Sequence, residues 1–166
     1  MTKDELLEQL AQLMIASFKH TLTLQGHTLT GELAASIEAA FLRFGTSDVI
    51  LFYMNDYGIP LDTGVKAERI PYDRGSGAGT SRYIDGLKRY AKLRFGVSDK
   101  EAQSIAFAIA NKHKKEGMPT KDSYRYSKNG FRTNWLDNAV AEASNDIDTL
   151  IQNYAGAFFE VLLSKV

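Results

Sequence analysis

A basic and aromatic stretch, residues 112–135, is where this otherwise neutral sequence could do chemistry. It contains seven Lys and Arg side chains and four aromatic ones around a Gly-Met-Pro-Thr turn. Such side chains can pair with nucleic-acid phosphates or with the carboxylates of a protein surface. Three interpretations follow: a nucleic-acid-binding strip, a docking surface for a protein partner, and a solvated loop between two helices.

Part of this stretch has a structural explanation. Lys112, Lys114 and Lys115 fall in the last turn of a predicted helix, where cations stabilise the negative end of the helix dipole. The basic residues that follow have no such explanation. The candidate interaction residues are therefore Lys121, Tyr124, Arg125, Tyr126, Lys128 and Arg132.

The geometry expected for these candidates is an extended segment. Residues 121–126 would then alternate between two sides, with Tyr124 and Tyr126 on one side and Lys121 and Arg125 on the other. Because Glu116 and Asp122 offset part of the charge, the stretch would contact only a few phosphates. Composition therefore favours a protein interface or a structural loop over nucleic acid.

One short motif could belong to a hydrolase. Residues 61–65 are LDTGV, and an Asp-Thr-Gly turn supplies the paired catalytic carboxylates of retroviral-type aspartic proteases. Those proteases are almost entirely β, whereas this sequence predicts mostly helices. Asp-Thr-Gly is also a common turn, so a protease that uses Asp62 is the minor hypothesis.

The remaining polar motifs favour structure over catalysis. His20, His27 and His113 lack the spacing of metal ligands, and the dipole of the preceding helix accounts for His113. The glycine-rich run 75–81 lacks the Lys-Ser/Thr ending of a phosphate-binding loop. With no nucleophile–base pair at a recognisable spacing, we expect no enzyme, cofactor or metal.

Length and composition set the frame for these motifs. The 166 residues predict a single domain, and 20 basic side chains balance 20 acidic ones. Any contact with nucleic acid must therefore be local. The absence of cysteine fits a reducing compartment, and no apolar run approaches the roughly 20 residues of a membrane span. We expect the chain to be made, and to stay, in a cytosol or in a particle assembled there.

Local signals predict most of the helices. Thr2 with Glu5, and Ser98 with Glu101, form capping boxes that begin two of them. Ser81 begins another, and glycines at 26, 96 and 117 mark helix ends. Residues 31–41 have apolar side chains at helical spacing and predict a second helix, with Leu33, Ile37, Ala40 and Phe41 inward. A long last helix is expected from 133 or 134 almost to the terminus, with a break near 144–145.

Strand signals are fewer. Residues 49–54, VILFYM, predict a buried strand because they are β-branched or aromatic and lie between turn signals. Residues 55–80 lose all periodicity and predict a long irregular arm with one more strand near 65–72. The sequence thus predicts a mainly helical α+β fold of about five helices packed with a small sheet, together with this arm and a basic loop at 117–132.

Three segments resemble small neck, tail-completion and minor tail proteins of tailed bacteriophages. Residues 29–37, LTGELAASI, are similar to a Thr-Gly-x-Leu-x-x-Ser-Ile segment of that family, and 49–64 fall where it has a strand and a glycine-containing turn. Residues 100–120, which end in Gly-Met-Pro-Thr, are similar to members from phages of gut bacteria. The sequence departs from the family in having His-Thr-Leu before Thr-Gly and a longer C-terminal helix.

The resemblance implies a structural virion protein without an active site, assembled in the host cytoplasm. It implies a homo-oligomeric ring at the head–tail junction that contacts the portal and adjacent connector or tail proteins through long loops. On this hypothesis residues 121–132 form a contact between subunits or rings, and in a ring they could also meet channel DNA. The alternative is a small nonspecific DNA-binding protein that uses residues 112–135.

Overall fold

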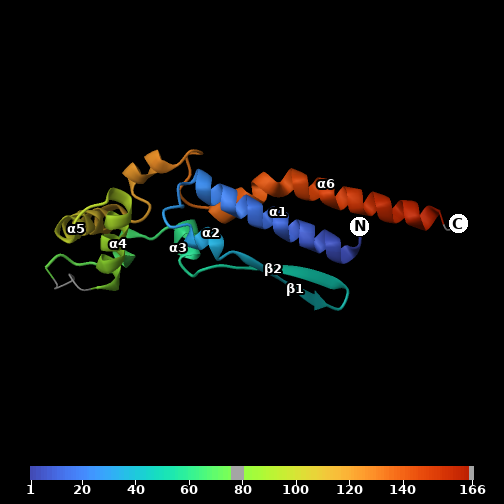
Figure 1. Ribbon diagram of the computed structural model, residues 1–166, viewed down its shortest axis with the longest axis horizontal. Helices are drawn as coiled ribbons and strands as arrows, with labels where there is room; N and C mark the ends of the chain where they lie inside the picture. Colours follow the sequence, from blue (N-terminus) through green and yellow to red (C-terminus); the bar gives the residue numbers. More distant parts are fainter. Residues whose placement is uncertain (76–80, 165–166) are drawn as a thin grey trace. The chain divides into compact units, whose positions relative to one another are not determined.

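The computed structural model describes residues 1–75 and 81–164 (Figure 1). Contacts between residues divide the chain into two compact units: unit 1 comprises residues 1–58 and 134–166, and unit 2 comprises residues 59–133. Helices dominate and the sheet consists of two antiparallel strands, which confirms the mainly helical α+β class. Compact units need not fold independently, so the single domain expected from the length stays a prediction.

Unit 1 begins with α1, Lys3–Leu24, as the sequence predicts. Thr2 and Glu5 form the expected capping box: the Thr2 hydroxyl accepts from the Glu5 amide, and the Glu5 carboxylate accepts from the Thr2 amide. Leu6, Met14 and Phe18 are buried, but Leu7, Leu10 and Leu13 only partly so. The helix ends at Leu24, with Gln25 as its C-cap, just before Gly26.

The predicted second helix is wrong beyond its first turn. Only Glu32–Ala35 is helical (α2), and the chain then forms β1, Glu38–Phe44, which pairs antiparallel with β2, Ser47–Tyr53. Leu33 and Ile37 are buried as expected, whereas Phe41 is exposed. The cause is tertiary, because pairing with β2 satisfies the backbone of a segment whose apolar spacing also fits a helix.

The strand predicted at 49–54 is confirmed as β2, but its side chains are not fully buried. Residues opposite each other share a face, so Phe41 and Ile50 lie on one face and Leu42 and Val49 on the other. Phe52, on the face of Phe41, meets Phe18 of α1 edge to face, with ring centroids 5.2 Å apart. The face of Leu42 is the outer face of the hairpin.

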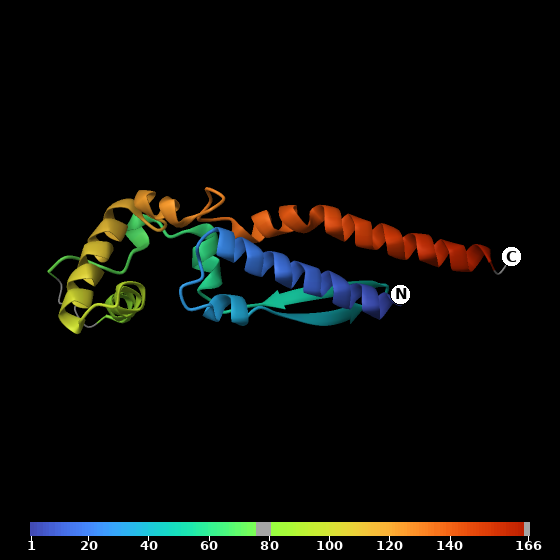
Figure 2. The same cartoon turned by 45° about the horizontal axis from the view of Figure 1, so that its top comes forward.

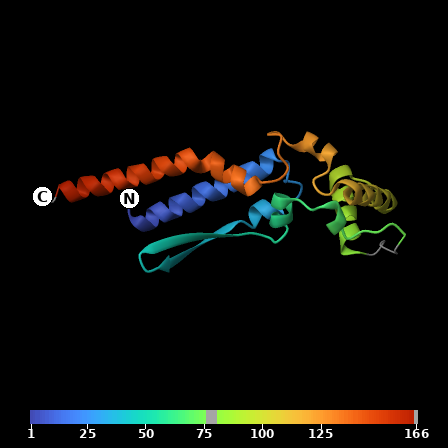
Figure 3. The same ribbon diagram turned by 180° about the vertical axis from the view of Figure 1, so that it is seen from behind.

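The last helix, α6, is a single element from Trp135 to Leu163, so the predicted break near 144–145 is wrong. Within unit 1, α1 lies between α6 and the hairpin, and α6 continues past the N-terminus of α1 (Figures 1 and 3). Trp135 is fully buried, and its ring lies edge to face with Phe18 at 5.7 Å. The Ser17 hydroxyl donates to the Ala139 carbonyl at 2.7 Å and so joins α1 to α6.

Unit 2 is built on α4, Arg82–Phe95, and α5, Asp99–Glu116, which pack against each other. Ser81 caps α4, the capping box of Ser98 and Glu101 begins α5, and glycines 96 and 117 end the two helices, all as predicted. The core of the unit is formed by Ile70, Tyr72, Ile84, Ala106 and Ala110.

The chain before α4 does not form the predicted strand. It holds the short helix α3, Gly58–Thr63, and the 3₁₀ helix η1, Ala67–Arg69. The only extended pairing of 65–72 with another described residue is a bridge between Val65 and Met118, which exchange two backbone hydrogen bonds of 2.7 Å. Ile70 and Tyr72 instead turn into the core, because burying them against α5 outweighs their strand propensity.

No helix in the described part of the chain is both long and apolar enough to cross a membrane.

Candidate interaction surface

The basic loop does not form the extended strip expected from the sequence. Lys121–Tyr126 is a 3₁₀ helix, η3, so the predicted alternation of two sides is wrong. Local hydrogen bonds favour this turn: the Ser123 hydroxyl donates to the Thr120 carbonyl at 2.6 Å, and the Lys121 amide donates to the Glu116 carboxylate at 3.0 Å. Asp122 forms an ion pair with Lys112 of α5, and this ion pair holds the turn against that helix.

The turn brings two guanidinium groups to one tyrosine ring. The Arg125 Cζ lies 4.9 Å from the centroid of Tyr126, and its guanidinium donates to the Tyr126 hydroxyl at 3.0 Å. The Arg94 Cζ, from α4, lies 5.2 Å from the same centroid. An aromatic face attracts cations, so Tyr126 can hold both guanidinium groups close together despite their like charge.

Arg132 lies near Tyr126 and near two further tyrosines, Tyr90 and Tyr124. Burial lowers the pKa of its guanidinium, and the nearby hydroxyls of Tyr90, Tyr124 and Tyr126 partly oppose that change. We define the arginine–tyrosine cluster by its members, which α4, η3 and the following loop supply: Tyr90, Arg94, Tyr124, Arg125, Tyr126 and Arg132.

Four of the six predicted interaction residues therefore come together: Tyr124, Arg125, Tyr126 and Arg132. The side chains of Lys121 and Lys128 are exposed, and among the described residues no hydrogen bond or ion pair joins either to the cluster. The interaction role of all six stays a prediction. What the cluster can do chemically is bind a carboxylate or phosphate, because guanidinium groups present paired donors in a planar fork.

Sequence reasoning missed the contribution of α4. Tyr90 and Arg94 are four residues apart, a spacing that places two side chains on the same face of a helix. The sequence RYAKLRF contains that signal, but nothing local connects it to Tyr126.

The distribution of charge over the two units was also missed. Unit 1 contains four Lys and Arg against twelve Asp and Glu, and unit 2 contains sixteen against eight, so their formal charges are −8 and +8. The neutral total conceals this asymmetry, which a count by segment would have found. The cluster therefore lies on a strongly basic unit.

Two of the three lysines explained by the helix dipole have specific roles as well. Lys112 pairs with Asp122 and lies 3.9 Å from Glu116. Lys114 lies 3.0 Å from Asp73 and donates to the Ile70 carbonyl at 3.3 Å. These two lysines tie α5 to its neighbours in unit 2.

The other polar motifs have no described contact with the cluster. Asp62 is in α3 and His20 lies 3.2 Å from Glu142. Nowhere in residues 1–75 and 81–164 do three His, Asp or Glu side chains gather as they would around a metal ion. The glycine-rich run 75–81 falls largely on residues 76–80, outside the described part of the chain.

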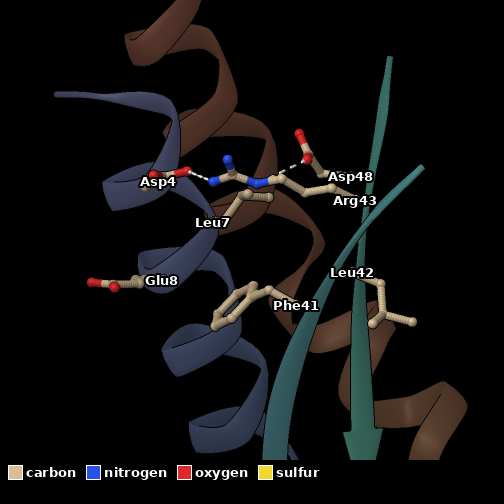
Figure 4. A pocket seen from close by; sticks show the side chains of 7 residues that line it. All are labelled: Asp4, Leu7, Glu8, Phe41, Leu42, Arg43 and Asp48. Carbon is tan, nitrogen blue, oxygen red and sulfur yellow. Dashed lines mark hydrogen bonds and ion pairs between the residues drawn. The ribbon is translucent and has the colours of Figure 1, made fainter. Parts of the chain in front are cut away.

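Unit 1 has a small hollow of its own. It has a volume of about 220 Å³ and lies where α1 meets the hairpin (Figure 4). Arg43 projects from β1 between Asp4 of α1 and Asp48 of β2, forming an ion pair with Asp4. The hollow is smaller than the roughly 300 Å³ at which ligand pockets begin, and its one cation, Arg43, pairs with Asp4 and Asp48. We interpret it as a link that holds the hairpin to α1.

These features define a mainly helical α+β protein with an arginine–tyrosine cluster on a basic unit. No known protein family matches the chain, and neither the curated proteins nor the solved structures include a significant match. The function must therefore be inferred from the chemistry of the chain's own residues.

Proposed function

We propose that this protein is a structural virion protein of a tailed bacteriophage. Identical copies would form a ring at the head–tail junction, as a neck, tail-completion or tail-terminator component, after assembly in the host cytoplasm. The resemblance of residues 29–37 suggests the family. The observation that carries the proposal is a large exposed apolar surface on unit 1, because surfaces of this kind are characteristic of chains that pack against other chains.

The outer face of the hairpin supplies one part of this surface. Leu42, Phe44, Val49 and Tyr53 are all exposed there, with Phe44 at 63% of its maximal area. A two-stranded hairpin has little stability of its own and is stabilised when other elements cover its apolar faces. This hairpin is apolar on both faces, so we expect both faces to be covered. In this chain α1 occupies one face, and the outer face is available to a neighbour.

The end of α6 supplies the other part. Beyond residue 150 its exposed apolar side chains are Ile151, Phe158, Phe159, Val161, Leu162 and Leu163. Phe158 retains 53% of its area and Phe159 retains 61%. Exposing so many large side chains is unfavourable in water, at about 25 cal/mol for each Å².

The proposed partners follow from these surfaces. Copies of this chain, together with the portal and adjacent connector or tail proteins, would cover the apolar side chains. The arginine–tyrosine cluster would pair with carboxylates of a neighbour, and in a ring it would also be available to channel DNA for nonspecific contact.

The decisive experiment is quantitative mass spectrometry of purified particles from the phage that encodes this chain. The proposal predicts that the protein is present at a fixed, low integer ratio to the portal protein. Treatment that detaches tails from heads should leave it on one side of the junction. Its absence from the particles would overturn the proposal.

A second candidate, a small nonspecific DNA-binding protein, is favoured by the +8 formal charge of unit 2. On this hypothesis the affinity for duplex DNA falls steeply with salt, and Arg94→Ala with Arg125→Ala lowers the slope of log affinity against log salt by about 2. Lys66→Ala with Lys100→Ala, which removes the same charge elsewhere on unit 2, is the control. Undetectable binding at low salt would exclude this candidate.

A further inference from the structure

The last helix has an unusual charge pattern. α6 contains Asp137, Glu142, Asp146, Asp148 and Glu160 and no Lys or Arg between Trp135 and Leu163. Only Glu142 has a described cationic or polar partner, since it accepts from Thr21 at 3.2 Å and lies near His20. The carboxylates beyond it have no ion pair with any described residue.

The acidic part of α6 is also the part that its own unit does not cover. Ala139 and Ala143 in the first half are buried, and α1 lies along this half. The helix then runs beyond α1 (Figure 2). We define the distal segment of α6 as residues 146–163. It combines three carboxylates with the exposed apolar side chains described above.

A second copy of the same helix is a poor partner for this segment. Two such helices could bury their apolar faces together, but every charge at their contact would be negative, and like charges at close range oppose association. The best partner is a surface that is both basic and apolar.

Unit 2 has such a surface around the arginine–tyrosine cluster. Arg94 and Arg125 supply the positive charge, and the rings of Tyr124 and Tyr126 are 43% and 38% exposed. Large apolar side chains exposed nearby in sequence are Leu93, Phe95 and Phe131. Carboxylates and guanidinium groups can then pair at the rim while aromatic and aliphatic side chains pack at the centre, which is the usual arrangement of a protein interface.

We infer that the distal segment of α6 of one copy docks on the arginine–tyrosine cluster of the next copy. The two surfaces differ, so the contact is head-to-tail, and repeating it generates a ring or a filament. This inference rests on the proposed function, and it specifies the contact that would join neighbouring copies in the proposed ring.

Charge reversal with the full chain tests the inference. The acid variant carries Asp146→Lys and Asp148→Lys, and the arginine variant carries Arg94→Glu and Arg125→Glu. Asp146, Asp148, Arg94 and Arg125 are all exposed, so both variants should fold, which circular dichroism checks. Matched controls reverse the same charge elsewhere: Glu8→Lys with Asp56→Lys in unit 1, and Lys66→Glu with Lys100→Glu in unit 2.

The expected result is measured by sedimentation velocity at low salt. The wild type and both controls assemble, each charge-reversal variant alone is monomeric, and an equimolar mixture of the two variants assembles again. The mixture recovers because the reversed α6 of one variant meets the reversed cluster of the other, while the remaining pair of surfaces is unchanged. Misfolding of either variant cannot produce this recovery.

Other outcomes overturn the inference. If both variants assemble like the wild type, this contact is excluded, while self-association and the proposed function survive. If the wild type is monomeric up to its solubility limit, docking between copies is excluded, and particle composition still decides the proposed function. If the mixture fails to recover, the two surfaces do not meet each other.

Discussion

The Tyr83 hydroxyl lies 2.7 Å from Nδ1 of His113, which joins α4 to α5 inside unit 2. Burial lowers the pKa of His113, an effect that Glu116 partly opposes, and burial together with Tyr72 raises the pKa of Tyr83 to about 12. In the folded chain both groups are therefore held neutral, with the hydroxyl able to donate to the imidazole.

This pair predicts that unit 2 loses stability at both ends of the pH range. The unfolded chain protonates His113 more readily, so the free energy of unfolding falls as the pH drops below about 6.5 and levels off once the folded histidine is protonated too. It falls again as the pH rises above 10, where the unfolded chain ionises Tyr83 first. Denaturant unfolding measured across the pH range should show both decreases in stability, which we call the acid limb and the alkaline limb.

Two substitutions separate the limbs. His113→Gln should flatten the acid limb attributable to this site, and Tyr83→Phe should flatten the alkaline limb. His20→Gln replaces an exposed histidine of α1 and serves as the matched control. An acid limb unchanged by His113→Gln would show that the buried imidazole does not produce it.

Two glycines of unit 2 should respond oppositely to alanine. Gly117 has φ +79° and ψ −167°, a conformation that is essentially restricted to glycine, and an added Cβ would lie 2.6 Å from the Val65 carbonyl oxygen. Gly117→Ala should therefore destabilise by about 2 kcal/mol or more. Gly86, inside α4, has no atom within 4 Å of such a Cβ, and Gly86→Ala should stabilise by about 0.5–1 kcal/mol. Chemical denaturation gives the free energy of unfolding of both variants. A Gly117→Ala variant as stable as the wild type would contradict the prediction.

The chain's single tryptophan reports on unit 1. Trp135 is fully buried, and its Nε1–H donates to the Gly58 carbonyl at 3.1 Å. Trp135→Phe keeps an aromatic ring but leaves that carbonyl without its donor, so we expect a loss of about 1–3 kcal/mol by circular dichroism. Trp135→Ala, which also opens a cavity, should cost more, at about 3–5 kcal/mol. A Trp135→Phe variant as stable as the wild type would show that the hydrogen bond contributes little.

The start of α5 depends on one hydroxyl. The Ser98 side chain accepts from the Glu101 amide, and the Glu101 carboxylate accepts from Ser98. Ser98→Ala should cost about 1 kcal/mol and increase hydrogen exchange in the first turn of α5. Within the described part of the chain the Ser104 hydroxyl bonds only to the Lys100 carbonyl of its own helix, so Ser104→Ala should be nearly neutral.

The sequence predicts helix ends better than any other part of this fold. The signals at Thr2, Ser98, Gly96 and Gly117 act over three or four residues, so they are complete in the local sequence. Residues 38–44 carry no equivalent signal. Their apolar spacing fits a helix, and their pairing with 47–53 depends on contacts that local periodicity cannot show.

The candidate surface was predicted in composition but not in geometry. Tyr124, Arg125, Tyr126 and Arg132 are recognisable in the sequence because they are basic or aromatic, and the structure places them together. The extended form was wrong because Lys112 and Glu116 of α5 hold the turn. Arg94 could not be added, since it reaches Tyr126 only through the packing of α4 in unit 2.

The hydrogen bond between Trp135 and Gly58 has a consequence for how the chain is partitioned. The chain leaves unit 1 after Gly58 and re-enters it at Asn134, so unit 2 is an insertion, and this bond holds its entry and exit points together. An insertion with adjacent ends can be excised and its flanks joined by a short linker without stretching the parent fold. A chain in which a short linker replaces residues 59–133 is therefore expected to keep the fold of unit 1.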